Sequence, residues 1–223
     1  MNPIKLKNQT LIKLLSNITK EFYSEQVVSL LSSGNYKRED EDIPNINSCS
    51  EEYFIKARTF PIELYAFPRS VIGVNNDALL PKNYDSFDNI RKKLLLVGNF
   101  LGTHQVALSM LYPDNGYIGW HHNGNAPGYN ILFTYSQDGD GYFKYYDYKT
   151  ESFVTINDNP GWNAKVGYYP DEKIQPEKVF WHCAETKLRR ITIAFVVKNK
   201  KLWENMIENV CEDDFDRKIL DVD

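Results

Sequence analysis

Helical spacing marks two stretches in the first hundred residues. Across residues 10–31 most apolar positions lie three or four apart, which is the period of an amphipathic helix, and the pattern is interrupted near Ser24. A second helix is predicted over residues 86–96, where Ser86 is placed to cap the first turn. Between these helices, the polar and charged residues 35–50 predict a loop, which we expect to be mobile.

The pattern changes at about residue 104. From there to residue 198, short apolar runs rich in Val, Ile, Tyr and Phe alternate with turn sequences such as PDNG, GNAPG, QDGDG and DNPG. Short strands at this spacing are typical of an antiparallel sandwich or barrel and not of alternating strands and helices. The expected fold class is therefore mainly β with flanking helices (α+β). A last helix is predicted over residues 201–210.

These elements predict three parts. Residues 1–100 form an N-terminal helical region with loops that packs on the core, and residues 101–200 form the β core. Residues 201–223 form a C-terminal helix and an acidic tail, which we expect to be a solvated surface. A chain of 223 residues is long enough to bury a sizeable core.

Composition narrows the class of protein. Aromatic residues make up 14%, and 26 Lys and Arg against 30 Asp and Glu give a formal charge of −4. The aromatic content argues against a disordered or fibrous chain, and the mild acidity gives no broad surface for duplex nucleic acid. No run approaches the roughly 20 apolar residues that cross a bilayer, and the first residues lack the apolar core of a secretion signal. We therefore expect a cytoplasmic protein without a membrane partner, in which the three cysteines are reduced thiols.

The first candidate for chemistry lies in the run YIGWHHN. Because side chains alternate along a strand, His121 and Asn123 are predicted to project to one side, and Trp120 and His122 to the other. His121 and Asn123 then offer two metal ligands aimed at one point. A histidine on a strand is more often a hydrogen-bonded or exposed residue than a ligand, so this pair needs support from elsewhere in the chain.

The last two predicted strands supply that support. His182 lies on the same face as Phe180 and Ala184, where a core-facing side chain is expected. In the final strand Arg190 shares its face with Thr192 and then with an alanine, so a hollow with one guanidinium at its end is expected. Such a hollow suits a bound carboxylate. The alternative is that Arg190 begins the strand at the surface and pairs with a nearby acid.

The order of these residues resembles the Fe(II)/2-oxoglutarate-dependent oxygenase superfamily, in particular its AlkB-like and prolyl-hydroxylase-like branches. The resemblance rests on Tyr112-Pro113, on Gly119-Trp120-His121 with Asn123, on His182 about 60 residues later, and on Arg190 with Thr192. It covers residues 106–197 and leaves the N-terminal hundred residues unassigned.

The resemblance implies a double-stranded β-helix, or jelly roll, of the cupin-like kind. It also implies that His121, Asn123 and His182 hold Fe(II), and that Arg190, Thr192 and Tyr112 contact the co-substrate 2-oxoglutarate. The implied activity is that of a dioxygenase (hydroxylase), which converts 2-oxoglutarate to succinate and carbon dioxide while it hydroxylates a C–H bond. The primary substrate is open and is a peptide side chain, a nucleobase or a small molecule.

Asn123 departs from the family pattern, which has an acidic ligand in this place. Asparagine keeps a ligating oxygen but lacks the negative charge, so iron should bind more weakly. Three outcomes are open: Asn123 ligates and the enzyme works, the position is left open, or the site has lost its chemistry. The competing hypotheses are therefore an active hydroxylase, a catalytically silent jelly-roll binding module, and a structural β-sandwich without a site.

Overall fold

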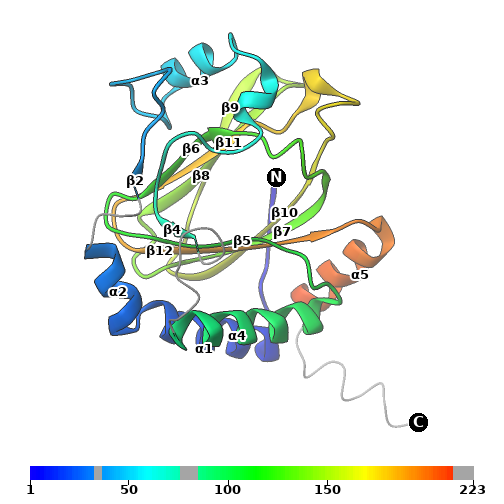
Figure 1. The fold of residues 1–223 in the computed structure, drawn as a ribbon. Helices are drawn as coiled ribbons and strands as arrows, with labels where there is room; N and C mark the ends of the chain where they lie inside the picture. The colour runs from blue at the N-terminus through cyan, green and yellow to red at the C-terminus, as the bar shows by residue number, and fades with distance from the viewer. Residues whose placement is uncertain (33–36, 76–84, 213–223) are drawn as a thin grey trace.

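The computed structural model describes residues 1–32, 37–75 and 85–212. Within these residues the chain forms two six-stranded sheets that lie face to face (Figure 1). The strand order is β1-β10-β7-β12-β5-β4 in the first sheet and β2-β3-β6-β11-β8-β9 in the second. The side chain of Ser86, which is predicted to cap a helix, is outside the described part of the structure. The same holds for the acidic residues Asp213, Asp214 and Asp216.

Strands β5 to β12 form the larger part of both sheets, with β9 at one edge of the second sheet. Consecutive strands switch from one sheet to the other at every step except at the β8–β9 hairpin, and each pairs with its neighbours in an antiparallel manner. This connectivity is that of a double-stranded β-helix, or jelly roll, so the predicted fold class is confirmed. The strands are β1 (Asn2–Ile4), β2 (Lys37–Arg38), β3 (Val71–Ile72), β4 (Val74–Asn75), β5 (Val106–Tyr112), β6 (Tyr117–His121), β7 (Gly128–Ser136), β8 (Gly141–Asp147), β9 (Ser152–Asn157), β10 (Gly161–Tyr169), β11 (His182–Thr186) and β12 (Arg190–Val197).

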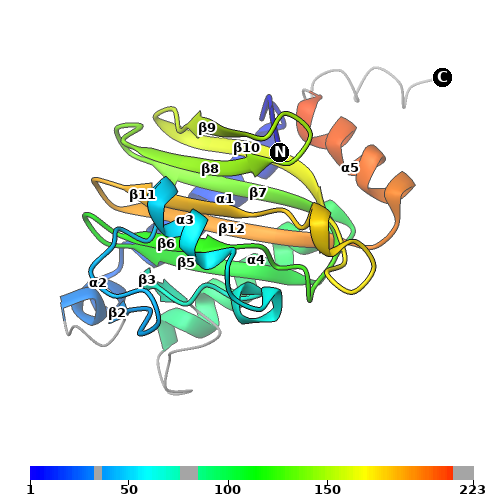
Figure 2. The ribbon, with the colours of Figure 1, turned by 90° about the horizontal axis from the view of Figure 1, so that it is seen from above.

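Helices cover the outer faces of the sheets. Helices α1 and α4 lie side by side under the first sheet, and α3 lies over the second (Figure 1). The view from above shows α3 crossing the second sheet and α5 at the side of the molecule (Figure 2). The helices are α1 (Gln9–Phe22), α2 (Glu25–Ser32), α3 (Glu51–Ala57), α4 (Asp85–Leu101) and α5 (Lys200–Cys211), with short 3-10 turns at Ile62–Tyr65 and Pro176–Lys178. The predicted interruption near Ser24 separates α1 from α2. None of the described helices is both long enough and apolar enough to cross a lipid bilayer.

Strand β12 shows how the sequence pattern produces this layering. Its residues Ile191, Ile193, Phe195 and Val197 join the core between the first sheet and helices α1, α4 and α5. Its alternate residues Arg190, Thr192, Ala194 and Val196 face the space between the two sheets. Every residue of the strand is buried. The two faces predicted for this strand are therefore confirmed, and only the inner face carries a charge.

Residues 37–75 add strands and a helix that the sequence pattern did not indicate. Strand β4 is added to the first sheet, and strands β2 and β3 are added to the second. Helix α3 packs on the second sheet. Residues 39–50 form turns, as predicted for a loop, but Ile43 and Cys49 are buried in the core under α3. The structure thus has an anchored loop where the sequence predicts a mobile one.

Asp40 is the polar anchor of this loop. Its carboxylate is buried and accepts hydrogen bonds from the hydroxyls of Tyr53 (2.5 Å) and Tyr65 (3.0 Å) and from Nε of Arg69 (2.9 Å). Burial alone would raise the pKa of Asp40, but these donors outweigh it and lower the pKa below its ordinary value. The network thereby holds residues 65–66 in place. Their backbone carbonyls accept hydrogen bonds from the N–H groups of His122 and Asn123, which directly follow strand β6.

We expect Asp40→Asn to lower the free energy of unfolding by about 1–3 kcal/mol at pH 7, because it removes the charge that accepts from Tyr53, Tyr65, Arg69 and the backbone N–H of Asp42. Since the pKa of Asp40 is lower in the folded state, its contribution is present above the unfolded value of about 4 and is lost as the pH falls through the folded value. Urea unfolding at pH 7 and pH 3 measures this. The exposed neighbour Glu39→Gln is the control, and an equal effect of Asp40→Asn at both pH values would contradict the prediction.

Candidate metal and carboxylate site

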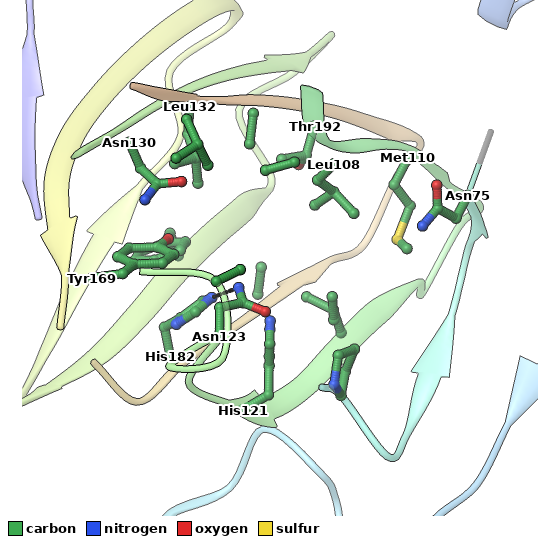
Figure 3. Close-up of a pocket in the computed structure, with 18 of the residues that line it drawn as sticks. Asn75, Leu108, Met110, His121, Asn123, Asn130, Leu132, Tyr169, His182 and Thr192 are labelled. Carbon is green, nitrogen blue, oxygen red and sulfur yellow. Dashed lines mark hydrogen bonds between the residues drawn. The ribbon is translucent and has the colours of Figure 1, made fainter. Parts of the chain in front are cut away.

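A cavity of about 330 Å³ lies between the inner faces of the two sheets (Figure 3). Strands β5 and β12 of the first sheet and β6 and β11 of the second supply much of its lining. The volume lies at the lower end of the range for small-molecule sites. The cavity lining includes all six residues singled out from the sequence, namely His121, Asn123, His182, Arg190, Thr192 and Tyr112.

The two histidines are direct partners across the β6–β11 ladder. The register sets His182 opposite His121, and the ring centroids are 4.2 Å apart. Nδ1 of His121 lies 2.8 Å from the carbonyl oxygen of Gly119, and Nδ1 of His182 lies 2.7 Å from that of Phe180. Because a carbonyl only accepts, both rings carry their proton on Nδ1 and leave Nε2 unprotonated. A backbone carbonyl that orients Nδ1 in this way is typical of metal-binding histidines.

Burial keeps both imidazoles neutral. His121 is 3% exposed and His182 is 4% exposed. Desolvation lowers the pKa of His121 to about 4 and lowers the pKa of His182 well below its ordinary value, and the proximity of the two rings lowers the latter further. At neutral pH the cavity therefore presents two unprotonated Nε2 atoms without any need to displace protons.

Asn123 reaches the cavity through a turn and not through strand alternation. Strand β6 ends at His121, and Asn123 adopts φ = 52°, a left-handed conformation that asparagine tolerates better than most residues. Its backbone N–H donates to the carbonyl of Ala66 (3.1 Å). Its amide lies beside the histidine pair, with Nδ2 3.4 Å from Nε2 of His182 (Figure 3). The predicted proximity of His121 and Asn123 is thus achieved by a different backbone path from the continuous strand that the sequence suggests.

These three side chains fit a weakly binding divalent-metal site. Two Nε2 atoms and one amide oxygen provide two nitrogen ligands and a neutral oxygen ligand, close to the two-histidine, one-carboxylate set of ferrous sites but without its charge. Within the described residues, no three His, Cys, Asp or Glu side chains gather where they could hold a metal ion. No described carboxylate lines the cavity either. Among the described residues of the cavity lining, no Asp or Glu therefore supplies the negative charge that Asn123 lacks.

Arg190 forms a charged end of the cavity. It is 1% exposed and pairs in register with Tyr112, whose ring centroid lies 5.6 Å from the guanidinium carbon. Its Nε donates to Asp158 (2.6 Å), and its Nη1 donates to the hydroxyl of Thr192 (2.7 Å). Nη2 is buried and has no hydrogen-bond partner among the described residues. Because an unpaired buried donor is costly, an acceptor such as a carboxylate that reached Nη2 would satisfy it.

Two charged residues behind Arg190 were not predicted from the sequence. Asp158 belongs to the DNPG segment, where it is typical of a turn, and Lys165 lies within β10. Both are buried, and Nζ of Lys165 lies 2.8 Å from Oδ1 of Asp158. The pattern of β10 held one indication, because Lys165 alternates with the apolar Ala164 and Val166 and so occupies the opposite face of a strand covered on both sides.

Other candidate residues lie away from this cavity. His122 faces the outer core, where its Nε2 lies 2.9 Å from the carbonyl oxygen of Ile62 and its Nδ1 accepts the N–H of Gly124. Cys183 lies in the core under α3, on the opposite face of β11 from His182. His104 is exposed. These positions agree with the alternation predicted for His122 and Cys183.

Comparisons with known proteins identify no family for this chain. No protein-family model and no curated protein matches the sequence. Among solved structures, a prolyl-4-hydroxylase of Pseudomonas putida has 9% identity and a TM-score of 0.42, over 89% of this chain and 92% of that one. A dioxygenase for auxin oxidation from rice has 16% identity and a TM-score of 0.37, over 86% and 70%. A full-length Neurospora crassa protein in complex with alpha-KG has 12% identity and a TM-score of 0.38, over 86% and 72%. With TM-scores below 0.5, these likenesses assign no role to any residue of this chain.

We expect the metal-free protein to lose stability between pH 7 and pH 5. The pKa of His121 is about 4 in the folded state and about 6.5 when unfolded, so the unfolded chain binds the proton first, and acidification favours unfolding. The full effect for His121 is about 3 kcal/mol, reached near pH 4. Urea unfolding at pH 7, 6 and 5 measures it, and His121→Gln should weaken the dependence while the exposed His104→Gln should not. A free energy of unfolding that stays constant over this range would contradict the prediction.

Proposed function

We propose that this protein is an Fe(II)/2-oxoglutarate-dependent oxygenase that hydroxylates a C–H bond of a substrate not yet identified. The observation that carries the proposal is that one cavity is lined by His121 and His182, whose Nε2 atoms are unprotonated, and by Arg190, whose Nη2 has no partner among the described residues. A metal-binding pair and a carboxylate-binding cation in one enclosed space suit a co-substrate that both chelates a metal and carries a second carboxylate. The motif order that resembles the oxygenase superfamily supports the same function.

Each residue has a role in this proposal. His121 and His182 would hold the metal through Nε2, and Asn123 would contribute its amide oxygen or remain beside the metal as a neutral neighbour. Fe(II), when bound, supplies the redox chemistry that activates oxygen. Arg190 and Thr192 would grip the distal carboxylate of 2-oxoglutarate, and Tyr112 would form the wall beside it.

The lining of the cavity favours an uncharged reacting group on the primary substrate. Arg190 is the one charged side chain among the described residues of the lining. The remaining lining is apolar or carries neutral amide and hydroxyl groups, among them Leu108, Met110, Leu132, Ala194, Asn75 and Asn130. A charged group from the substrate would be buried there without a partner, which is costly.

The alternative, a catalytically silent jelly-roll binding module, has an observation of its own. Nδ2 of Asn123 lies 3.4 Å from Nε2 of His182, in a position where it can donate to that atom. In this arrangement the amide occupies the lone pair that a metal ion needs. The cavity would then keep its carboxylate-binding end without metal chemistry.

Anaerobic addition of Fe(II) and 2-oxoglutarate separates the two functions. We expect the native protein to show the visible charge-transfer band of a metal–co-substrate complex, and aerobic incubation to yield succinate. The His121→Ala/His182→Ala double variant should lose both, while the exposed control His104→Ala should keep them. Metal binding that survives in the double variant would overturn the proposal, and a band seen only in Asn123→Asp would favour the silent module.

We expect Asn123→Asp to bind the metal at least about tenfold more tightly, because it restores a negative charge at contact distance from a divalent ion. Aspartate also tolerates the left-handed conformation of this position, so the variant should fold. Titration with Mn(II) in the absence of 2-oxoglutarate measures the affinity. Equal affinities of native and variant protein would show that residue 123 does not contact the metal.

A further inference from the structure

Lys165, Asp158 and Arg190 form a buried chain of charges between the sheets. Their exposed fractions are 2%, 5% and 1%. Lys165 Nζ lies 2.8 Å from Oδ1 of Asp158, and Arg190 Nε lies 2.6 Å from Oδ2 of the same carboxylate. Thr134 completes the group, since its hydroxyl lies 3.1 Å from Lys165 Nζ and donates to Asp158 Oδ1 (3.2 Å).

This group contains two cations and one anion. One carboxylate shared by two cations leaves a surplus of one positive charge in a buried region, and a buried charge without a counter-ion is expensive. Arg190 is the member of this group that lines the cavity, and its Nη2 is unpaired among the described residues. Asp158 accepts from Lys165 through Oδ1 and from Nε of Arg190 through Oδ2, and it makes no hydrogen bond to Nη2.

The backbone holds this arrangement in place. The N–H of Asp158 donates to the carbonyl of Gly141 (2.9 Å). A Cβ atom at Gly141 would lie 2.7 Å from Oδ2 of Asp158 and 3.0 Å from Cδ of Arg190, so only glycine lets the ion pair approach this strand so closely. These contacts hold the guanidinium in one orientation, in which Nη2 alone has no hydrogen-bond partner among the described residues.

We propose that Lys165 and Asp158 are positioning and specificity residues for a carboxylate ligand, with Asp158 aiming Arg190 and Lys165 setting the net positive charge that the ligand neutralises. Without Lys165, Asp158 and Arg190 would neutralise each other, and the cavity would bind an anion little more tightly than a neutral molecule of the same shape. With Lys165, the site is electrostatically complete only when a carboxylate is bound.

The proposal deepens the proposed function at the co-substrate end of the same cavity, yet it makes a claim that needs no metal. Because the surplus charge belongs to the protein alone, a dicarboxylate should bind to the metal-free protein. Glutarate tests this directly, since it lacks the 2-oxo group through which 2-oxoglutarate chelates a metal. Its diamide, glutaramide, has nearly the same shape and no charge.

The experiment is isothermal titration calorimetry of the metal-free protein with glutarate, 2-oxoglutarate and glutaramide. We expect both dicarboxylates to bind to the native protein and glutaramide not to bind. Lys165→Met should weaken dicarboxylate binding on the order of tenfold or more, because it removes the buried positive charge that the ligand would neutralise. The exposed Lys201→Met on α5 is the matched control and should bind as the native protein does.

Two further measurements separate this role from a merely structural one. If Lys165 serves the ligand, the ligand-free Lys165→Met variant should have a melting temperature no lower than that of the native protein, because an uncompensated buried charge has been removed. Lys165→Gln, which keeps hydrogen-bonding capacity, should lose dicarboxylate affinity to a similar extent. Native-like dicarboxylate binding by both variants, or no binding by the metal-free native protein, would overturn the proposal. Loss of iron chemistry with intact glutarate binding would instead overturn only the proposed function.

Discussion

The burial of both faces of the innermost strands, β6 and β11 in one sheet and β7 and β12 in the other, is the constraint on which this structure depends. The outer faces pack under α1, α4 and α5 or under α3, and the inner faces of the two sheets enclose a common space. Because alternate residues point to opposite faces, one strand can serve the hydrophobic core and the cavity at the same time. In β12, Ile191 and Ile193 stabilise the fold while Arg190 and Thr192 line the cavity.

The cavity has two polar regions, and they differ in net charge. The His121 and His182 pair is neutral, and the adjoining Asn123 adds no charge. Arg190, Asp158 and Lys165 together carry a positive charge in an interior of low dielectric. No described carboxylate lines the cavity, so a bound anion would supply the counter-charge. These charges thus favour the proposed carboxylate end more clearly than the proposed metal end.

Residues 1–32, 37–75 and 85–100 pack on and extend the β core. Strands β1 to β4 extend both sheets, and the backbone carbonyls of Ser48 and Ser70 accept hydrogen bonds from Trp120 and Gly119 in β6. The hydrogen bonds of Asp40 to Tyr53 and Arg69 tie the loop after β2 to helix α3 and to the segment before β3. Since Asn123 hydrogen-bonds to Ala66 in the same region, the position of its amide depends on residues more than fifty positions earlier in the chain. A side chain outside regular secondary structure needs such support to hold one orientation.

Local patterns were sufficient to predict the mainly β class, the main helices and the faces of His182 and Arg190, because hydrophobic period and strand alternation are properties of neighbouring residues. The jelly roll and the grouping of His121, His182 and Arg190 were predicted only through the order of a motif. Other features depend on contacts between distant segments. The cross-strand register sets His182 opposite His121, and a left-handed turn brings in Asn123. The DNPG turn and β10 deliver Asp158 and Lys165 to Arg190. Such long-range contacts leave no local periodicity, so a turn aspartate and a strand lysine could not be recognised as parts of one buried charge cluster.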